Sequence, residues 1–366
     1  MGQREGTVED MVNPWQNTRI FLTGHTGFKG GWLALWLANR GAVIRGYSLG
    51  PPTEPNLFTV ASVSSVLEDV RGDIREYSKL EAAMSAFAPE VVFHLAAQPL
   101  VRRSYSDPLG TYATNVMGTA HVLEAVRKTP SVRAVVCVTT DKCYQNHEWT
   151  WPYRESDALG GHDPYSSSKA CAELVTAAYR SSFFPLERLA EHPVAVATAR
   201  AGNVIGGGDW AEDRLIPDLI RGFQEKKPVL IRRPGATRPW QHVLDPIRGY
   251  IVLAEKLLAQ KAEYATAYNF GPSDEDPWSV ECIANKLVGL WGNGAAWKAD
   301  SAGDLHESHC LRLDASKARA ELNWKARLRI EKALEWTMNW YRRWQQGADM
   351  HQETLAQIRE FEKLSD

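Results

Sequence analysis

From Arg19 onward, short apolar runs alternate with longer stretches that have a helical pattern of apolar and polar residues. The runs cover residues 20–22, 43–44, 66–67, 91–93, 135–138 and 194–196. Apolar runs of this length, without polar alternation, are typical of strands buried on both faces of a sheet. Helices are expected between them, at residues 31–39, 78–87, 109–127 and 166–179. This βαβ alternation predicts an α/β fold with a doubly wound parallel sheet covered by helices on both sides.

The alternation ends after about Asn203, where three consecutive glycines and several prolines separate shorter elements. We expect a smaller mixed α/β lobe over residues 203–345, in which some elements return to the main sheet. Amphipathic helices are expected within it at residues 246–260, 279–290 and 329–342. Residues 1–17 are polar and aperiodic, which predicts a flexible leader, and residues 346–366 are expected to form a C-terminal tail.

The composition is that of an ordinary globular protein. Of the 366 residues, 44% are hydrophobic and 23% are charged, which excludes a disordered chain. The 42 basic and 44 acidic side chains nearly cancel, so the net charge gives no support to nucleic-acid binding. We therefore expect no nucleic-acid partner.

The cysteine pattern and the hydropathy indicate the compartment. Five cysteines without paired short spacing suggest neither a disulfide framework nor a metal site, so no metal is expected and a reducing cytoplasm is the simplest interpretation. The chain does not open with a basic segment followed by an apolar one, and it has no apolar run of about 18 residues. The sequence thus predicts a cytoplasmic protein without a membrane partner.

A glycine-rich turn lies directly between the first predicted strand and the first predicted helix. Its sequence is TGHTGFKG, from Thr23 to Gly30. Glycine is needed where a Cβ atom would block the backbone, and the helix N-terminus presents free N–H groups and a positive dipole to a pyrophosphate. The turn predicts dinucleotide binding by a Rossmann-type domain over residues 18–202. The candidate cofactor residues in the turn are Gly24, Thr26, Gly27, Phe28, Lys29 and Gly30.

A tyrosine and a lysine lie four residues apart in a predicted helix. At this spacing Tyr165 and Lys169 share one helix face. A tyrosine pKa of about 10 makes the phenol a poor base, but a nearby lysine favours the phenolate, which then accepts a proton from a hydroxyl group. The same spacing is also common on exposed helix faces. Thr140 supports the catalytic interpretation, because it follows the strand predicted at residues 135–138.

Taken in order, these motifs resemble the extended short-chain dehydrogenase/reductase family, whose sugar-nucleotide enzymes begin with a similar TGxxGFxG turn. The matching features are the turn, the segment His94-Leu95-Ala96-Ala97-Gln98, Thr140 and the YxxxK pair. The resemblance covers nearly all of residues 19–341. It implies that Tyr165 is the base for hydride transfer, that Lys169 supports its phenolate and that Thr140 orients the reacting group.

The resemblance implies NAD as the cofactor. Asp73 and Ile74 would contact the adenine, and Leu95, Ala96 and Ala97 would lie beside the nicotinamide ribose, with Tyr165 and Lys169 also in contact with the cofactor. A surface capping role is the alternative for Asp73. The second strand ends without the acidic residue that commonly binds the 2′-hydroxyl of NAD, so this strand does not settle cofactor choice. His25 and Lys29 depart from the residues of many family members.

The two residues after Thr140 distinguish an enzyme that eliminates water from one that carries out redox chemistry alone. The 4,6-dehydratase branch of the family places an acid directly after the catalytic threonine. Oxidation of a hexose at C4 makes the C5 hydrogen acidic, and the C6 hydroxyl then leaves if a general acid and a general base are present. Asp141 is the candidate acid. Lys142, where relatives often have Glu, is the candidate base and requires a lowered pKa.

The substrate and partners also follow from the resemblance. Stretches such as TTDKCYQN and RPWQHVLDP resemble the dehydratases that act on CDP-glucose rather than dTDP-glucose or GDP-mannose. They imply the product CDP-4-dehydro-6-deoxy-D-glucose, deoxysugar biosynthesis of the lipopolysaccharide O-antigen kind, and a homodimer formed through helices 109–127 and 166–179. Arginine binds a diphosphate through a fork of donors. The candidate substrate residues are Gln98, Asn203, Arg214, Arg238, Asn269 and His306.

Two other functions stay open. A nucleotide-sugar 4-epimerase needs Thr140, Tyr165 and Lys169 but not Asp141. A regulatory protein that binds NAD without turnover needs none of them, and the intact tyrosine and lysine pair argues against it.

Overall fold

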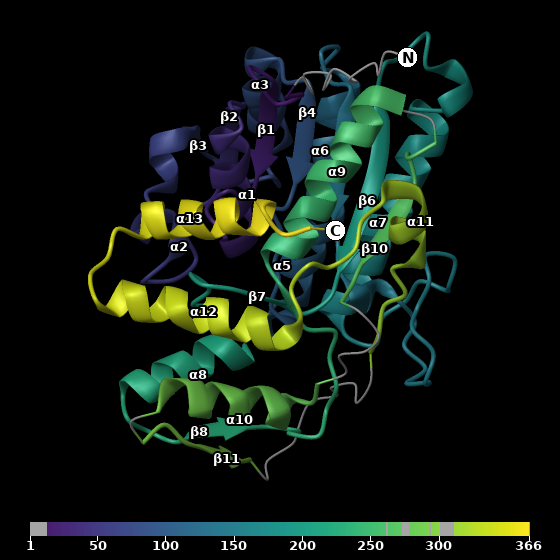
Figure 1. Ribbon diagram of the computed structural model, residues 1–366. Coiled ribbons are helices and arrows are strands. Elements are labelled where there is room, and N and C mark those ends of the chain that lie inside the picture. The colour runs from purple at the N-terminus through teal and green to yellow at the C-terminus, as the bar shows by residue number, and fades with distance from the viewer. Residues whose placement is uncertain (1–12, 261–262, 273–277, 293, 301–310, 366) are drawn as a thin grey trace, which may run out of the picture.

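A parallel sheet of seven strands forms the centre of the computed structural model, which describes residues 13–260, 263–272, 278–292, 294–300 and 311–365 (Figure 1). The strand order is β10-β6-β5-β4-β1-β2-β3. The strands are β1 (Arg19–Thr23), β2 (Val43–Ser48), β3 (Glu68–Arg71), β4 (Val91–His94), β5 (Ala134–Val138), β6 (Ala195–Ala201) and β10 (Ala267–Phe270). Strand order reverses between β1 and β4, the point at which such sheets bind ligands. The predicted Rossmann-type doubly wound sheet is confirmed.

Both faces of the sheet are covered by helices, because alternate residues of each strand point to opposite sides. On one side, Ile20 and Leu22 of β1 join a large apolar core with α1, α9, α12 and α13. On the other side, Phe21 joins a smaller core with α3 and α6. These helices are α1 (Phe28–Asn39), α3 (Tyr77–Phe87), α6 (Gly118–Arg127), α9 (Leu244–Gln260), α12 (Ile330–Gln345) and α13 (Met350–Glu362). The runs at residues 20–22, 91–93, 135–138 and 194–196 are thus buried, as the sequence indicates, whereas Val43 is exposed and residues 66–67 are half-buried outside the strands.

A smaller lobe follows β6 and lies below the sheet in Figure 1. It contains α8 (Leu215–Gln224), α10 (Val280–Trp291) and the paired parallel strands β8 (Val229–Ile231) and β11 (Trp297–Ala299). A second short pair, β7 (Val204–Ile205) and β9 (Gln241–His242), joins this lobe to the main body. Helix α9 and strand β10 come from the same stretch of sequence but belong to the main body. Helix α9 packs in the large core on one face of the sheet, and β10 pairs with β6.

The remaining elements are short, apart from one long helix. Helix α7 (Pro164–Phe183) carries the YxxxK pair. The short elements are α2 (Leu57–Val60), η1 (Val63–Val66), α4 (Val101–Ser106), α5 (Pro108–Tyr112), η2 (Ala113–Met117), η3 (Asp141–Cys143), η4 (Leu186–Arg188) and α11 (Ser316–Leu322). The helix expected at residues 109–127 is therefore divided into α5, the π-helical turn η2 and α6. The strand expected at residues 66–67 begins at Glu68, after a 3₁₀ turn.

The chain ends differ from the sequence expectations where they are described. Trp15 is fully buried and its indole N–H donates to Glu255 Oε1 at 2.6 Å, so residues 13–17 are not a flexible leader. Residues 1–12 lie outside the described part. The expected tail contains α13, whose Phe361 is buried against Trp36 of α1 at a ring distance of 5.6 Å. No helix among the described residues combines the length and the apolarity needed to span a bilayer.

Candidate active site

The glycine-rich turn packs tightly against the carboxyl end of β4. Gly24 has a φ of +81°, and a Cβ atom there would lie 2.7 Å from the backbone N of Ala96. A Cβ atom at Gly30 would lie 2.1 Å from the carbonyl O of Gly24, so the turn closes only with glycine at both positions. No side chain caps α1 at Gly27. An uncapped helix N-terminus behind a glycine turn fits the pyrophosphate of a dinucleotide.

The other residues of the turn point in different directions. Thr26 Oγ1 lies 2.9 Å from Ser48 Oγ and ties the turn to the end of β2. The buried His25 ring lies 2.8 Å from Asp69 Oδ1, and burial lowers the His25 pKa. Phe28 packs beneath Gly206, where a Cβ atom would approach its ring to 3.1 Å.

Lys29 is directed inward, toward the catalytic pair. Its Nζ lies 6.0 Å from the centre of the Tyr250 ring. Burial lowers the Lys29 pKa to about 7, and the charge of Lys169 contributes to the same shift. Of the two departures from the family pattern, His25 therefore faces β3 and Lys29 faces the catalytic centre.

The expected adenine segment follows β3. Asp73 Oδ1 accepts a hydrogen bond of 2.9 Å from the backbone N of Arg75, and the Arg75 side chain lowers the Asp73 pKa. Ile74 is buried against Gly118. Asp73 thus accepts a local hydrogen bond of the kind expected from a surface capping residue, which was the alternative interpretation. Its contact with adenine stays a prediction.

Leu95 and Ala96 line the same turn. The backbone N–H groups of both residues donate to Thr23 Oγ1 at 3.2 Å. Ala97 follows them along the loop and is half-buried. This segment and the glycine turn therefore form one continuous backbone surface at the point where the strand order reverses.

Tyr165 and Lys169 lie in the first turns of α7. The helix begins with Pro164 and is capped by Asp163, whose carboxylate accepts from the Ser166 N–H at 2.9 Å. Both catalytic candidates are buried, and Lys169 Nζ donates to the Val138 carbonyl at 3.4 Å, at the end of β5. The helix therefore holds the pair directly against the strand that leads to Thr140.

Burial shifts both pKa values away from the charged forms. It raises the pKa of Tyr165 to about 12, against an opposing hydrogen bond from Thr140. It lowers the pKa of Lys169 to about 8, against the opposing charge of Glu173. The tyrosine therefore needs a nearby positive charge to become a phenolate.

Thr140 is hydrogen-bonded to Asp141 and acts to lower the pKa of Tyr165. It caps the 3₁₀ turn η3, and its Oγ1 donates to Asp141 Oδ1 at 2.8 Å. Asp141 Oδ2 is buried and has no hydrogen-bond partner within the described residues. Burial raises the Asp141 pKa, although Lys142, Thr140 and Arg238 oppose this shift. Lys142 follows in the same turn and is half-buried.

Two predicted substrate residues lie in electrostatic reach of these groups. Arg214 Nη1 forms an ion pair of 2.7 Å with Asp209, and the charge of Arg214 acts to lower the Tyr165 pKa. Arg238 is buried, and its charge acts to lower the Asp141 pKa. Asn203 is half-buried in the loop after β6, where its carbonyl accepts from the Gln241 N–H at 3.0 Å. His306 lies outside the described residues.

Two of the predicted substrate residues form hydrogen bonds within the protein, and their contact with a substrate stays a prediction. The Gln98 amide donates to the Leu100 carbonyl and to Thr111 Oγ1, both at 3.0 Å, and accepts from the Leu100 N–H, so it shapes its own loop. Asn269 is fully buried, and its amide accepts from the Tyr144 hydroxyl at 2.7 Å and donates to the carbonyls of Tyr153 and Asp314. Both amide N–H donors of each residue are therefore used within the described part of the protein.

The sequence reasoning missed a buried ion pair beside the site, between Glu173 and Arg200. Two signals were present. Glu173 lies four residues after Lys169 and so shares its helix face, and Arg200 places a charge in a buried strand whose other residues are alanine, valine and threonine. Over the described ranges, no group of three or more His, Cys, Asp or Glu residues is arranged to hold a metal ion.

Comparison with known proteins gives one family and several relatives. The model of the NAD dependent epimerase/dehydratase family matches residues 20–271. A CDP-glucose 4,6-dehydratase from Salmonella typhimurium is 52% identical over 92% of this chain and 94% of its own length. A dTDP-glucose 4,6-dehydratase from Xanthomonas campestris is 27% identical over 89% of this chain and 94% of its own length.

Solved structures share the fold. The dTDP-glucose 4,6-dehydratase from Bacillus anthracis in complex with NAD has a TM-score of 0.73 at 24% identity, over 90% of this chain and 98% of its own. The UDP-glucose 4-epimerase from Thermotoga maritima with UDP-glucose has a TM-score of 0.75 at 21% identity, over 90% of this chain and 100% of its own. At these identities the likeness establishes the fold alone.

Proposed function

We propose that this chain, which belongs to the NAD dependent epimerase/dehydratase family, converts CDP-D-glucose into CDP-4-dehydro-6-deoxy-D-glucose and water. The enzyme is then a hydro-lyase. The choice of CDP-glucose is supported by the 52% identity to the Salmonella typhimurium CDP-glucose 4,6-dehydratase. The product serves deoxysugar biosynthesis, of the kind that supplies the O-antigen of lipopolysaccharide.

The observation that favours a dehydratase rather than an epimerase is the position and environment of the Asp141 carboxyl group. Its carboxyl group follows Thr140 directly, is buried with a raised pKa, and has one oxygen without a partner among the described residues. Burial favours the protonated form of such a carboxyl group, which is the form that delivers a proton to a leaving hydroxyl. An epimerase has no use for that proton.

The cofactor is NAD, and the chemistry that it supplies when bound is reversible hydride transfer at the sugar. The residues that would hold it form the glycine turn, the segment after β3 and the segment after β4, together with the YxxxK pair. They are Gly24, Thr26, Gly27, Phe28, Lys29, Gly30, Asp73, Ile74, Leu95, Ala96, Ala97, Tyr165 and Lys169. Asn203, Arg214 and Arg238 would hold the nucleotide sugar, with His306 from the undescribed part.

The catalytic side chains divide the proton transfers among them. The Tyr165 phenolate takes the proton of the C4 hydroxyl, while the Lys169 ammonium stabilises the phenolate. Lys142, as a neutral amine, removes the C5 proton and later returns it to C5. Asp141 protonates the C6 hydroxyl, which leaves as water when the C6–O bond breaks.

Thr140 completes the proton balance. At the end of one turnover Tyr165 has gained a proton and Asp141 has lost one. The Thr140 hydroxyl donates to Asp141 Oδ1 at 2.8 Å and acts to lower the pKa of Tyr165, so it is the group between the two that can relay the proton. In this relay the hydroxyl takes the proton of the phenol while it gives its own to the carboxylate, which restores both groups.

A homodimer in the cytoplasm accounts for the apolar surface of the catalytic domain. Four large apolar side chains are exposed on α5, η2 and α7, namely Leu109, Met117, Leu174 and Phe183. Apolar groups gathered on neighbouring helices are typical of a protein–protein interface. The contacts between α5 and α7 and between η2 and α7 bring these elements together on one side of the domain.

The proposal is tested with a panel of CDP-, dTDP-, UDP- and GDP-glucose in the presence of NAD, followed by mass spectrometry. Loss of one water from CDP-glucose, much faster than from the other three, is the expected result. Retention of mass with inversion at C4 would instead indicate the epimerase. Binding of NAD without consumption of any sugar nucleotide would indicate the regulatory protein.

A further inference from the structure

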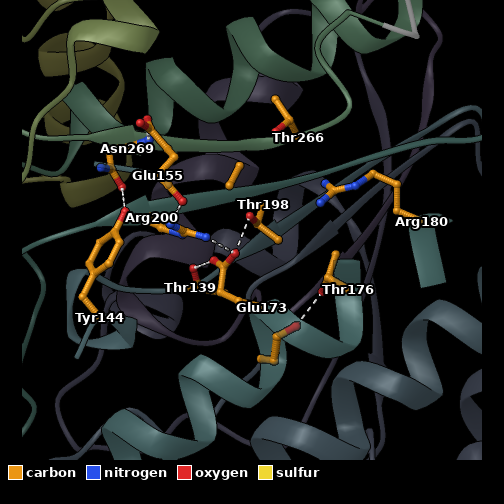
Figure 2. Close-up of polar contacts among 12 residues, drawn as sticks. Thr139, Tyr144, Glu155, Glu173, Thr176, Arg180, Thr198, Arg200, Thr266 and Asn269 are labelled. Carbon is orange, nitrogen blue, oxygen red and sulfur yellow. Dashed lines mark hydrogen bonds and ion pairs between the residues drawn. The ribbon is translucent and has the colours of Figure 1, made fainter. Parts of the chain in front are cut away.

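A buried ion pair that the reaction itself does not use lies behind the catalytic loop (Figure 2). Glu173 comes from α7 and Arg200 from β6, and their side chains are only 3% and 4% exposed. Arg200 Nη2 donates to Glu173 Oε2 at 2.8 Å. Burying two charges is costly even when they are paired, so such a pair calls for a reason beyond stability.

The Glu173 end of the pair holds the residue before Thr140. Glu173 Oε1 accepts a hydrogen bond from the Thr139 hydroxyl, and Oε2 accepts one of 2.7 Å from the Thr198 hydroxyl (Figure 2). The Thr139 backbone N–H is itself paired with the Ala199 carbonyl at 2.9 Å. Backbone and side chain together thus fix the point at which β5 passes into the catalytic loop.

The Arg200 end holds the residue after the loop. Arg200 Nη1 donates to the Tyr144 hydroxyl at 2.7 Å, and its guanidinium lies 5.0 Å from the centre of the Tyr144 ring. The Tyr144 hydroxyl donates in turn to Asn269 Oδ1 at 2.7 Å (Figure 2). The ring also stacks on Tyr153 at 5.2 Å. Tyr144 is therefore fixed by groups from β6, β10 and its own loop.

The two ends enclose the residues that carry the elimination chemistry. Thr139 and Tyr144 flank Thr140 to Cys143, the segment that contains Asp141 and Lys142. Glu173 also shares a helix face with Tyr165 and Lys169, because the three residues are spaced by four along α7. The Glu173 carboxylate thus links the helix that carries Tyr165 and Lys169 to the loop that carries Asp141 and Lys142.

We propose that Glu173 and Arg200 are positioning residues that fix the loop of Asp141 and Lys142 relative to Tyr165 and Lys169. This inference rests on the proposed function for its kinetic consequence. The pair touches neither the reacting sugar nor the cofactor in the reaction described above, and it acts through Thr139 and Tyr144. A displacement of about 1 Å in such a loop can cost about a hundredfold in rate.

The experiment compares two isosteric variants that remove the same kind of bond. Thr139→Val and Thr198→Val each remove one hydroxyl donor from the Glu173 carboxylate, but only Thr139 leads into the catalytic loop. Thr139→Ser retains the hydroxyl, and Tyr144→Phe tests the other end of the loop. The kcat and KM for CDP-glucose are measured with the NAD-loaded full chain, together with amide hydrogen exchange over residues 139–146.

For Thr139→Val and Tyr144→Phe we expect kcat to fall about tenfold or more, with KM changed by less than about threefold and faster exchange over residues 139–146. Thr198→Val should stay within about twofold of the wild type in all three measurements, and Thr139→Ser should recover most of the rate. Equal behaviour of Thr139→Val and Thr198→Val would overturn the proposal. If the wild type does not convert CDP-glucose, the proposed function fails, and the exchange comparison alone decides the positioning role.

Discussion

The Thr140 hydroxyl donates to the Asp141 carboxylate at 2.8 Å and also acts on the Tyr165 phenol, whose pKa it acts to lower. A hydroxyl has a single hydrogen to donate, so it cannot stabilise an ionised Tyr165 and an ionised Asp141 at the same time. In the proposed reaction the two groups therefore share one negative charge. Before the reaction the charge belongs on Tyr165 and the proton on Asp141, and after it the two are exchanged.

Replacing Thr140 by Val should separate the first turnover from those that follow. The variant loses the hydroxyl that returns the proton from Tyr165 to Asp141, and we expect the steady-state rate to fall by about 10² relative to the wild type. The first turnover should fall less, which gives a burst of product in rapid-quench measurements. Thr140→Ser, which retains the hydroxyl, should lack the burst. Equal slowing of the first and later turnovers would contradict the relay.

Replacing Asp141 by Asn should slow loss of water more than oxidation at C4. We expect water loss to fall by about 10² to 10⁴, because the amide cannot donate the proton, while the absorbance of reduced cofactor still rises in a single turnover. Burial raises the Asp141 pKa, so the ionised carboxylate opposes folding at neutral pH and the variant should be no less stable. Equal loss of both steps would refute the assignment of Asp141 as the acid.

The Lys169 pKa of about 8 predicts opposite pH dependences for activity and stability. Activity should decrease as the pH rises through about 8, because the ammonium that stabilises the phenolate loses its proton. Stability should increase between about 8 and 10.5, because the unfolded chain still binds the proton that folded Lys169 has released. Both dependences should be absent from Lys169→Met, measured by kcat profiles and by urea unfolding at each pH.

The ion pair of Glu173 and Arg200 should show strong coupling in unfolding experiments. Glu173→Gln and Arg200→Met each leave one buried charge without its partner, and each should lower the free energy of unfolding by about 3 to 5 kcal/mol. The double variant has no buried charge at this place and should lose less than the sum of the two. Additive losses in urea unfolding would mean that the two charges do not interact.

The exposed apolar residues on α7 should control dimer formation. Leu174 is 57% exposed, and Leu174→Glu is expected to convert the proposed homodimer to a monomer by placing a charge in the proposed apolar interface. Leu230→Glu is the matched control, because Leu230 is 64% exposed on β8 in the smaller lobe. Sedimentation velocity distinguishes the two forms. A dimer that persists in Leu174→Glu would place the interface elsewhere.

The local features of this protein could be predicted from the sequence because they depend on short-range geometry. Strands buried on both faces leave apolar runs, a strand-to-helix turn that closes on itself requires Gly24 and Gly30, and a four-residue spacing places Tyr165 and Lys169 on one helix face. These rules gave the sheet, the turn and the catalytic pair. The position of Thr140 after an apolar strand followed in the same way.

Other features depend on which segments the fold brings together, and no local pattern encodes them. Glu173 and Arg200 are 27 residues apart and meet only because α7 packs beside β6. Asn269 has the residue type of a substrate ligand, but β10 joins the sheet next to β6 and buries its amide among the groups that fix the catalytic loop. Burial and pairing of polar groups are decided by tertiary contacts, because a side chain's partners come from whichever elements surround it. The sequence alone thus determined the main elements and the order of the candidate catalytic residues, and the tertiary structure decided which polar groups pair with one another to hold the site in place.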